Sequence, residues 1–129
     1  MIFNVNNETS VSIISSNNDY PDFTNNWRWV KYSDGTFKAE YRETINTGTL
    51  SESGAIAGLM YQTHTVALPF TPVSIDVPKW DDSGHDGVIW VSNHGGESLT
   101  SVNAMIMRAI KSTTALTLRL GCTATGRWK

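Results

Sequence analysis

The chain has 129 residues, of which 40% are hydrophobic and 17% charged, and its formal net charge at pH 7 is −2. This length suits one globular domain with a sizeable core. Ten lysines and arginines against twelve acidic residues exclude the strongly basic surface on which nucleic-acid binding depends. No apolar run reaches the roughly 18 residues of a membrane span, and no basic segment leads into an apolar one as in a signal peptide. We therefore expect a chain that is made in the cytoplasm, stays unprocessed and binds neither nucleic acid nor membrane.

The residue types favour strands and turns over helices. Aromatic residues make up 10% of the chain, five of them tryptophan, and Thr, Ser, Asn and Gly are abundant. The single cysteine, Cys122, has no partner for an internal disulfide and too few neighbouring ligands for a structural zinc site. We expect it to be a small buried hydrophobe.

The first 25 residues are polar and contain six asparagines. Only residues 11–14 have the apolar content of a short strand. Polar termini of this kind are commonly held loosely against a domain. We therefore predict that residues 1–25 form an extended arm or linker and that residues 26–129 form one domain.

A β-hairpin is predicted over the sequence WRWVKYSDGTFKAEYRE at 27–43. An Asp-Gly pair between alternating segments favours a two-residue type I′ loop, here Asp34 and Gly35. That loop places Trp27 opposite Arg42, which suits a cation–π contact. The expected core face then carries Val30, Tyr32, Phe37, Ala39 and Tyr41, and the expected second face carries Trp27, Trp29, Lys31, Lys38, Glu40 and Arg42.

This predicted register leaves two indole rings among charged side chains. A neighbouring subunit can cover them, the N-terminal arm can cover them, or they can stay open for a ligand. Because large exposed aromatic patches usually mark an interface, we predict a subunit interface at Trp27, Trp29 and Arg42.

The remaining segments read as short strands separated by turns. Residues 58–70 alternate, and Pro69 should end this strand or mark an edge, because proline cannot donate to a β-ladder. Residues 101–111 fit either a helix or a strand, and the alternating Leu and Thr that follow favour a strand. The further predictions are a loop at 44–57, a tight polar loop at 79–87, a central strand at 88–92 and a last strand with Trp128 packed. About eight short strands predict an all-β fold, an antiparallel, jelly-roll-like β-sandwich.

The sequence holds no complete catalytic or phosphate-binding motif, so we predict no enzyme activity and no cofactor. The densest polar cluster is WDDSGHDG with a following SNHG. A solvated turn explains it most simply. A divalent metal is the alternative, because imidazole and carboxylate suit zinc, although the fragment also resembles half of a calcium loop. The residues of this cluster are Asp81, Asp82, His85, Asp86 and His94.

A saccharide site needs an aromatic platform and a few polar anchors. Trp80, with Asp82, His85 and Asp86 on the same predicted loop, has that composition. We name these four residues as candidate saccharide contacts. The alternative is that Trp80 plugs the end of the sandwich, since tryptophan is largely buried in most proteins. His64, in QTHTV, is expected to be an ordinary sheet residue.

Three motifs resemble a known family. They are W-x-W-x-K-Y-S-D-G-T at 27–36, T-V-A-L-P-F at 65–70 and T-G-R-W-K at 125–129. Together they resemble the C-terminal modules of tail-fibre and baseplate proteins, the receptor-binding proteins of phages and prophages of Gram-positive bacteria. Tyr32 stands where that family usually has tryptophan, and residues 37–41 depart from its usual ending.

The resemblance implies a β-sandwich head domain that forms a homotrimer at the tip of a phage tail. Such modules contact other tail proteins and often bind cell-wall saccharide, and they carry no shared catalytic set. The expected location is a virion, or the cytoplasm of a bacterium that carries a prophage. Two alternatives are a small metal-assisted cell-wall hydrolase using His85, Asp86 and His94, and a purely structural virion decoration protein.

Overall fold

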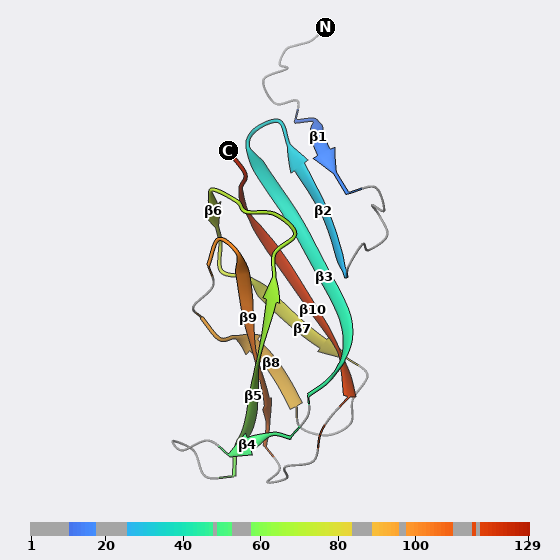
Figure 1. The fold of residues 1–129 in the computed structure, drawn as a ribbon, viewed down its shortest axis with the longest axis vertical. Coiled ribbons are helices and arrows are strands. Elements are labelled where there is room, and N and C mark those ends of the chain that lie inside the picture. The colour runs from blue at the N-terminus through green and yellow to red at the C-terminus, as the bar shows by residue number, and fades with distance from the viewer. Residues whose placement is uncertain are drawn as a thin grey trace, which may run out of the picture.

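The computed structural model describes residues 11–17, 26–47, 49–52, 58–83, 89–95, 98–109, 115 and 117–129. These residues form ten β-strands in two antiparallel sheets (Figure 1), which confirms the all-β prediction. They include no helix that is long and apolar enough to cross a membrane. The first sheet contains β1 (Ile13–Ser16), β2 (Trp27–Tyr32), β3 (Thr36–Asn46), β6 (Ser74–Ile75), β7 (Lys79–Ser83) and β10 (Thr117–Arg127). The second contains β4 (Ser51–Glu52), β5 (Met60–Ala67), β8 (Ile89–Asn93) and β9 (Ser101–Arg108).

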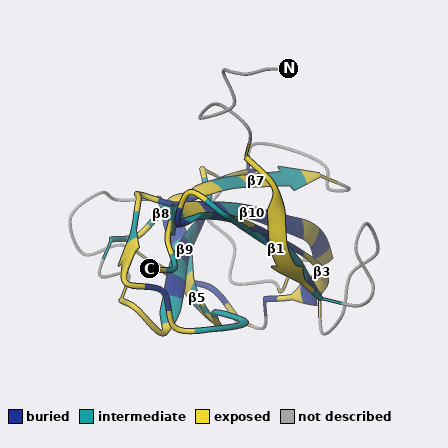
Figure 2. Ribbon diagram, turned by 90° about the horizontal axis from the view of Figure 1, so that it is seen from above, coloured by how far each residue is buried: buried dark blue, intermediate teal, exposed yellow. Residues whose placement is uncertain are grey.

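The two sheets face each other and enclose the core (Figure 2). The first sheet has the order β1-β2-β3-β10, and both β6 and β7 pair with the far edge of β10. The second has the order β4-β5-β9-β8. β3 and β10 pair along eleven residues, from Thr36–Arg127 to Asn46–Thr117, and form the spine of the first sheet.

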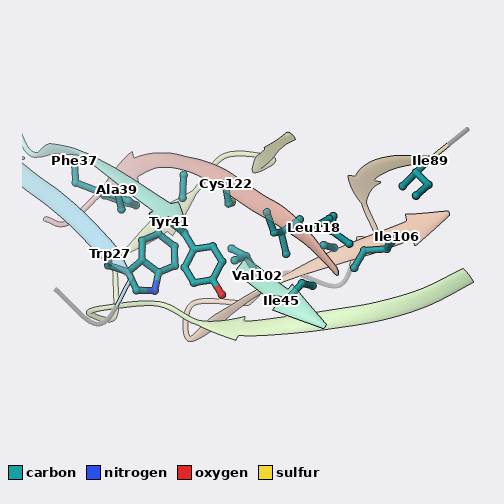
Figure 3. Packing of buried hydrophobic residues seen from close by; sticks show 13 residues of the cluster. Trp27, Phe37, Ala39, Tyr41, Ile45, Ile89, Val102, Ile106, Leu118 and Cys122 are labelled. Carbon is teal, nitrogen blue, oxygen red and sulfur yellow. The ribbon is translucent and has the colours of Figure 1, made fainter. Parts of the chain in front are cut away.

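Alternation along the strands supplies the core, because successive side chains of a strand point to opposite faces. On β9 the inward positions are Val102, Ala104 and Ile106, and all three are fully buried. The opposing sheet contributes aromatic and aliphatic side chains (Figure 3). Each large side chain buried in this way stabilises the fold by about 1.5–3 kcal/mol. The buried members from the first sheet are Trp27, Phe37, Ala39, Tyr41, Ile45, Leu118, Leu120, Cys122 and Ala124.

The hairpin register predicted from the sequence is wrong by one residue. β2 and β3 pair Lys31 with Phe37, Trp29 with Ala39 and Trp27 with Tyr41. The loop between them therefore has three residues, 33–35, and the Gly35 amide donates to the Tyr32 carbonyl at 3.1 Å. Only Gly35 of this loop has a positive φ, +91°, whereas the predicted two-residue loop needs two such residues.

A slip of one residue moves a whole strand face to the other side of the sheet. Trp27, Trp29 and Lys31 accordingly lie on the core face with Tyr41. Trp27 is only 4% exposed, and its ring centroid lies 5.3 Å from that of Tyr41. The predicted pairing of Trp27 with Arg42 is absent, since Trp27 lies opposite Tyr41 and the Arg42 amide donates to the Asn26 carbonyl. The Arg42 side chain lies on the outer face, next to Gly121 of β10. Trp27 thus needs no neighbouring subunit to cover it. The interface at Trp27, Trp29 and Arg42 was predicted because both tryptophans were expected to be exposed, and this reason does not hold for Trp27.

Part of the expected N-terminal arm joins the sheet. β1 pairs with β2, from Ile13–Tyr32 to Ser16–Val30. The Asn17 side chain continues this pairing, because its amide donates to the Trp27 carbonyl and accepts from the Trp29 amide, both at 3.0 Å. All side chains of β1 are exposed, so backbone hydrogen bonds rather than burial hold this strand.

Four further segments test the sequence predictions. The strand chosen for 101–111 is confirmed as β9 over Ser101–Arg108, and Pro69 follows the end of β5 as expected. The loop predicted at 79–87 is wrong for its first half, which is β7. The segment predicted as a central strand is β8, which occupies an edge of the second sheet among the described strands and leaves Trp90 39% exposed.

Aromatic side chains close one end of the sandwich. The Lys31 ammonium lies 4.5 Å from the Phe70 ring centroid, 5.4 Å from that of Trp29 and 5.8 Å from that of Trp128. These distances suit cation–π attraction. The Trp128 indole donates to the Tyr32 carbonyl at 2.8 Å, which ties the C-terminus to the hairpin.

Replacement of Trp27 tests the observed register. Trp27→Ala should lower the free energy of unfolding by about 3–5 kcal/mol, because it removes a buried ring. Trp90→Ala should cost about 1 kcal/mol or less, since Trp90 is partly exposed. Trp27→Phe, which keeps an aromatic ring and loses the indole hydrogen bond, should fall between them. Urea unfolding followed by circular dichroism measures all three, and equal losses at Trp27 and Trp90 would rule out this register.

Candidate functional site

A partly open cavity of about 540 Å³ lies at the edge of the sandwich between β2–β3 and β5. β5 pairs with β4 only at Tyr61 and Met60, so the rest of this edge of β5 has no partner strand among the described residues. The Trp27 indole bridges the two sheets here by donating to the Ala67 carbonyl at 2.9 Å. The described residues that line the cavity are Asn17, Asn26, Trp27, Trp29, Tyr41, Glu43, His64, Thr65, Val66, Ala67, Leu68 and Pro69.

Aromatic rings form one wall of the cavity. Trp27, Trp29 and Tyr41 project from the core face of β2 and β3, since the observed register places them on the same side. Trp29 is half-buried and meets Phe70 edge-on, with ring centroids 5.2 Å apart. Packing on both sides therefore fixes these rings in place before any ligand arrives.

Three polar side chains lie together beside this wall. The Tyr41 hydroxyl donates to Glu43 Oε1, and the same carboxylate oxygen lies 4.0 Å from His64 Nε2. Tyr41 and Glu43 are two residues apart on β3, so they share the inner face, and His64 reaches them from β5 across the sandwich. The side chains of Glu43 and His64 remain 38% and 30% exposed, which leaves both accessible from the cavity.

Burial and the neighbouring Glu43 carboxylate raise the pKa of Tyr41 above its usual value of 10. Burial disfavours the phenolate, and the hydrogen bond to a carboxylate favours the neutral hydroxyl. Tyr41 is therefore a neutral donor at physiological pH. It holds the Glu43 carboxylate in one orientation toward the cavity.

This set of groups is suited to binding polyhydroxyl compounds. Trp29 is half-buried and can present its ring to the apolar face of a sugar, whereas Trp27 and Tyr41 are only 4% and 3% exposed and support it from the core. A carboxylate, an imidazole and two asparagine side chains can exchange hydrogen bonds with hydroxyls. Glycoside hydrolysis usually requires two carboxyl groups on either side of the scissile bond. Glu43 is the only carboxylate among the described lining residues.

Trp80 and Asp82, two of the saccharide contacts predicted from the sequence, do not line this cavity. Trp80 belongs to β7 opposite Cys122, is half-buried against the core and meets Tyr41 at a ring-centroid distance of 6.4 Å. Its indole nitrogen is buried and has no hydrogen-bond partner among the described residues. This position agrees with the alternative in which Trp80 plugs the sandwich.

The other members of the predicted cluster are dispersed or lie outside the described residues. Asp82 is half-buried in β7 opposite Leu120, and His94 is exposed after the end of β8. His85 and Asp86 fall outside the described part of the chain. Within that part, no three His, Cys, Asp or Glu side chains gather as metal ligands.

Sequence reasoning missed Tyr41, Glu43 and His64 as a group. His64 was expected to be a sheet residue, which is correct, but its facing partner on β3 is 21 positions away in another sheet. The misplaced register also put Trp27 and Trp29 on the face opposite to Tyr41. No local pattern in the sequence contains this cross-sheet juxtaposition.

The raised pKa of Tyr41 predicts how stability depends on pH. Its stabilising contribution is complete below pH 10, the pKa of the unfolded chain, and is lost as pH rises through the higher folded pKa. Tyr41→Phe should therefore be less stable than the original chain at pH 8, by about 1–3 kcal/mol for a lost charge-assisted hydrogen bond. This gap should stay constant up to about pH 9 and shrink as the pH rises from 10 toward the folded pKa in urea titrations. A gap that stays constant over that interval would contradict the assigned interaction with Glu43.

No family model, curated protein or solved structure matches the chain.

Proposed function

We propose that this protein is a non-enzymatic attachment module of a phage or prophage tail, and that it binds cell-surface saccharide in the cavity between β2–β3 and β5. The observation that carries the proposal is the aromatic wall of Trp27, Trp29 and Tyr41 facing Glu43 and His64 in one cavity. The sequence motifs at 27–36, 65–70 and 125–129, which resemble those of tail-tip modules, support it independently.

The dimensions and chemistry of the cavity support a small polar ligand with an apolar face. Its volume of about 540 Å³ lies within the ~300–1,000 Å³ that is usual for small-molecule sites. The rings are held by packing and by the indole hydrogen bond to Ala67, so little conformational entropy is lost on binding. Glu43 and His64 sit on the strands β3 and β5 rather than on a loop, which keeps their spacing constant.

The proposal includes a jelly-roll-like head domain and a homotrimer that contacts other tail proteins. Apolar groups for subunit contact are present on the edge strand β1 and beside it, where Val11, Ile13 and Ile14 are 50%, 57% and 56% exposed. An exposed apolar edge strand is a common place for chains to meet. The subunit interface predicted from the sequence at Trp27, Trp29 and Arg42 is not part of this proposal, because Trp27 and Trp29 lie on the inner face of the first sheet and Arg42 lies on its outer face.

Binding to cell walls tests the attachment function. The full chain should adsorb saturably to purified cell walls of Gram-positive bacteria and to their isolated polysaccharides. His64→Ala and Glu43→Gln should each weaken adsorption at least tenfold, because each removes one hydrogen-bonding group from the cavity. His94→Ala is the matched control, since this histidine is exposed after the end of β8, and it should bind as the original chain does.

Each other outcome has a defined meaning. The absence of saturable adsorption to every wall and polysaccharide would favour a purely structural decoration protein. Release of reducing sugar ends from the walls, with zinc bound stoichiometrically, would favour the metal-assisted hydrolase. Adsorption that is unchanged in His64→Ala and Glu43→Gln would place the saccharide site elsewhere.

Assembly has a separate test. Light scattering in dilute buffer should give three times the chain mass of 14.3 kDa. Ile13→Lys and Ile14→Lys, which place charges on the exposed side chains of β1, should reduce the mass toward that of a single chain. A monomer in the original chain would remove the trimer from the proposal and leave the saccharide site unaffected.

A further inference from the structure

Two smaller hollows lie on the first sheet near the cavity. One, of about 320 Å³, is lined by Asn26, Arg42, Glu43, Thr44 and Arg119. It shares Asn26 and Glu43 with the aromatic cavity, which we call subsite 1. The second hollow, of about 260 Å³, shares Arg42 and Arg119 with the hollow of 320 Å³. Its other lining residues are Asp81, Ser83, Leu120 and Gly121. Subsite 1 thus shares two residues with the hollow of 320 Å³, which shares two others with the hollow of 260 Å³. The cavity and the two hollows therefore form a continuous series around the edge of β3.

The strand registers explain why the hollows reach the outer face. Arg42 and Asp81 lie on either side of Gly121, and Thr44 and Ser83 lie on either side of Arg119. Gly121 has no side chain, and a Cβ built there would lie 2.5 Å from Asp81 Oδ1. Glycine therefore leaves a notch across β10 into which the Asp81 carboxylate extends.

Asn26 lies at the edge of β3 where the inner cavity meets the outer hollow, and it lines both. β2 begins at the next residue, so β3 beyond Arg42 has no β2 partner among the described residues. Asn26 has a φ of +69°, a left-handed conformation that asparagine tolerates better than most residues, and its carbonyl accepts from the Arg42 amide at 2.9 Å. This turn exposes the corner that connects the inner cavity with the outer hollows.

The charges of the outer hollows are balanced. Arg42 and Arg119 supply two fork-shaped donors, and Glu43 and Asp81 supply two acceptors. An anionic ligand would meet Asp81 as well as the arginines, so charge does not favour it. A neutral ligand with neighbouring hydroxyls can accept from a guanidinium and donate to a carboxylate at the same time.

We propose that these outer hollows are a second saccharide subsite, subsite 2, which takes the hydroxyls of a neutral sugar. The ligand of this protein is then a chain of several sugar units that passes from subsite 1 around the β3 edge. This inference rests on the proposed function, because it names the size and charge class of the saccharide that the cavity holds. Glu43 and Asn26 contact the ligand between the two subsites.

The test uses the full chain on an array of immobilised oligosaccharides. The array carries glucose, galactose, rhamnose and N-acetylglucosamine series of one to six units, together with uronic-acid and sugar-phosphate series of the same lengths. For the preferred sugar, affinity should rise at least tenfold between two and five units. Arg119→Ala should remove that gain and change binding of the disaccharide less than twofold.

Two further variants separate subsite 2 from general effects. Gly121→Ala keeps every charge and displaces the Asp81 carboxylate, so it should also lower the affinity for the longer oligosaccharides. Lys38→Ala is the matched control, because it removes one cation from an exposed position on the same face of β3. It should leave the length dependence unchanged.

The outcomes distinguish the two proposals. Binding that shows no dependence on length, or a length dependence that survives both Arg119→Ala and Gly121→Ala, overturns subsite 2 while the saccharide function stands. Preference for the charged series, with affinity that falls steeply with added salt, overturns the neutral assignment. No binding to any series overturns the proposed function, and subsite 2 with it.

Discussion

The turn between β2 and β3 is the constraint on which the rest of the structure depends. A three-residue loop ending at Gly35, with φ of +91°, sets the pairing of Trp27 with Tyr41. One residue fewer would direct both tryptophans to the outer face. The core would then lose its largest side chain on this strand, and the aromatic wall of subsite 1 would not exist. Both the stability of the core and the proposed binding function therefore depend on the conformation of the three-residue loop that ends at Gly35.

The site also depends on how unequal the two sheets are. The first sheet extends beyond β3 to β2 and β1, whereas the short β4 is the only described strand beyond β5 in the second sheet. Among the described strands, none opposes the inner faces of β2 and β3 over part of their width. Leu68, Pro69 and Phe70 cover some of this area, and the remainder is subsite 1. The outer hollows depend on a different feature, the missing side chain at Gly121.

Local patterns in the sequence were sufficient for the all-β class, for β5 and β9, and for burial of Cys122. They failed where two arrangements satisfy the same pattern. Asp34-Gly35 is compatible with loops of two or three residues, and alternation alone does not choose between them. The polar stretch at 79–83 forms β7 because its backbone completes the free edge of β10, a tertiary effect without a local signal. The meeting of Glu43 with His64 has the same origin, since it needs the two sheets to be placed first.

The hydrogen bond from the Trp27 indole to Ala67 has a consequence for the behaviour of the molecule among other copies of itself. A strand edge with free carbonyls invites another chain to add to it, which leads toward aggregation. At Ala67 the indole occupies the acceptor that an incoming strand would use. A side chain of one sheet thereby blocks the end of the other sheet's edge strand. The hydrogen bond between Trp27 and Ala67, two residues that line the cavity, thus also hinders a second polypeptide from pairing with β5 at Ala67.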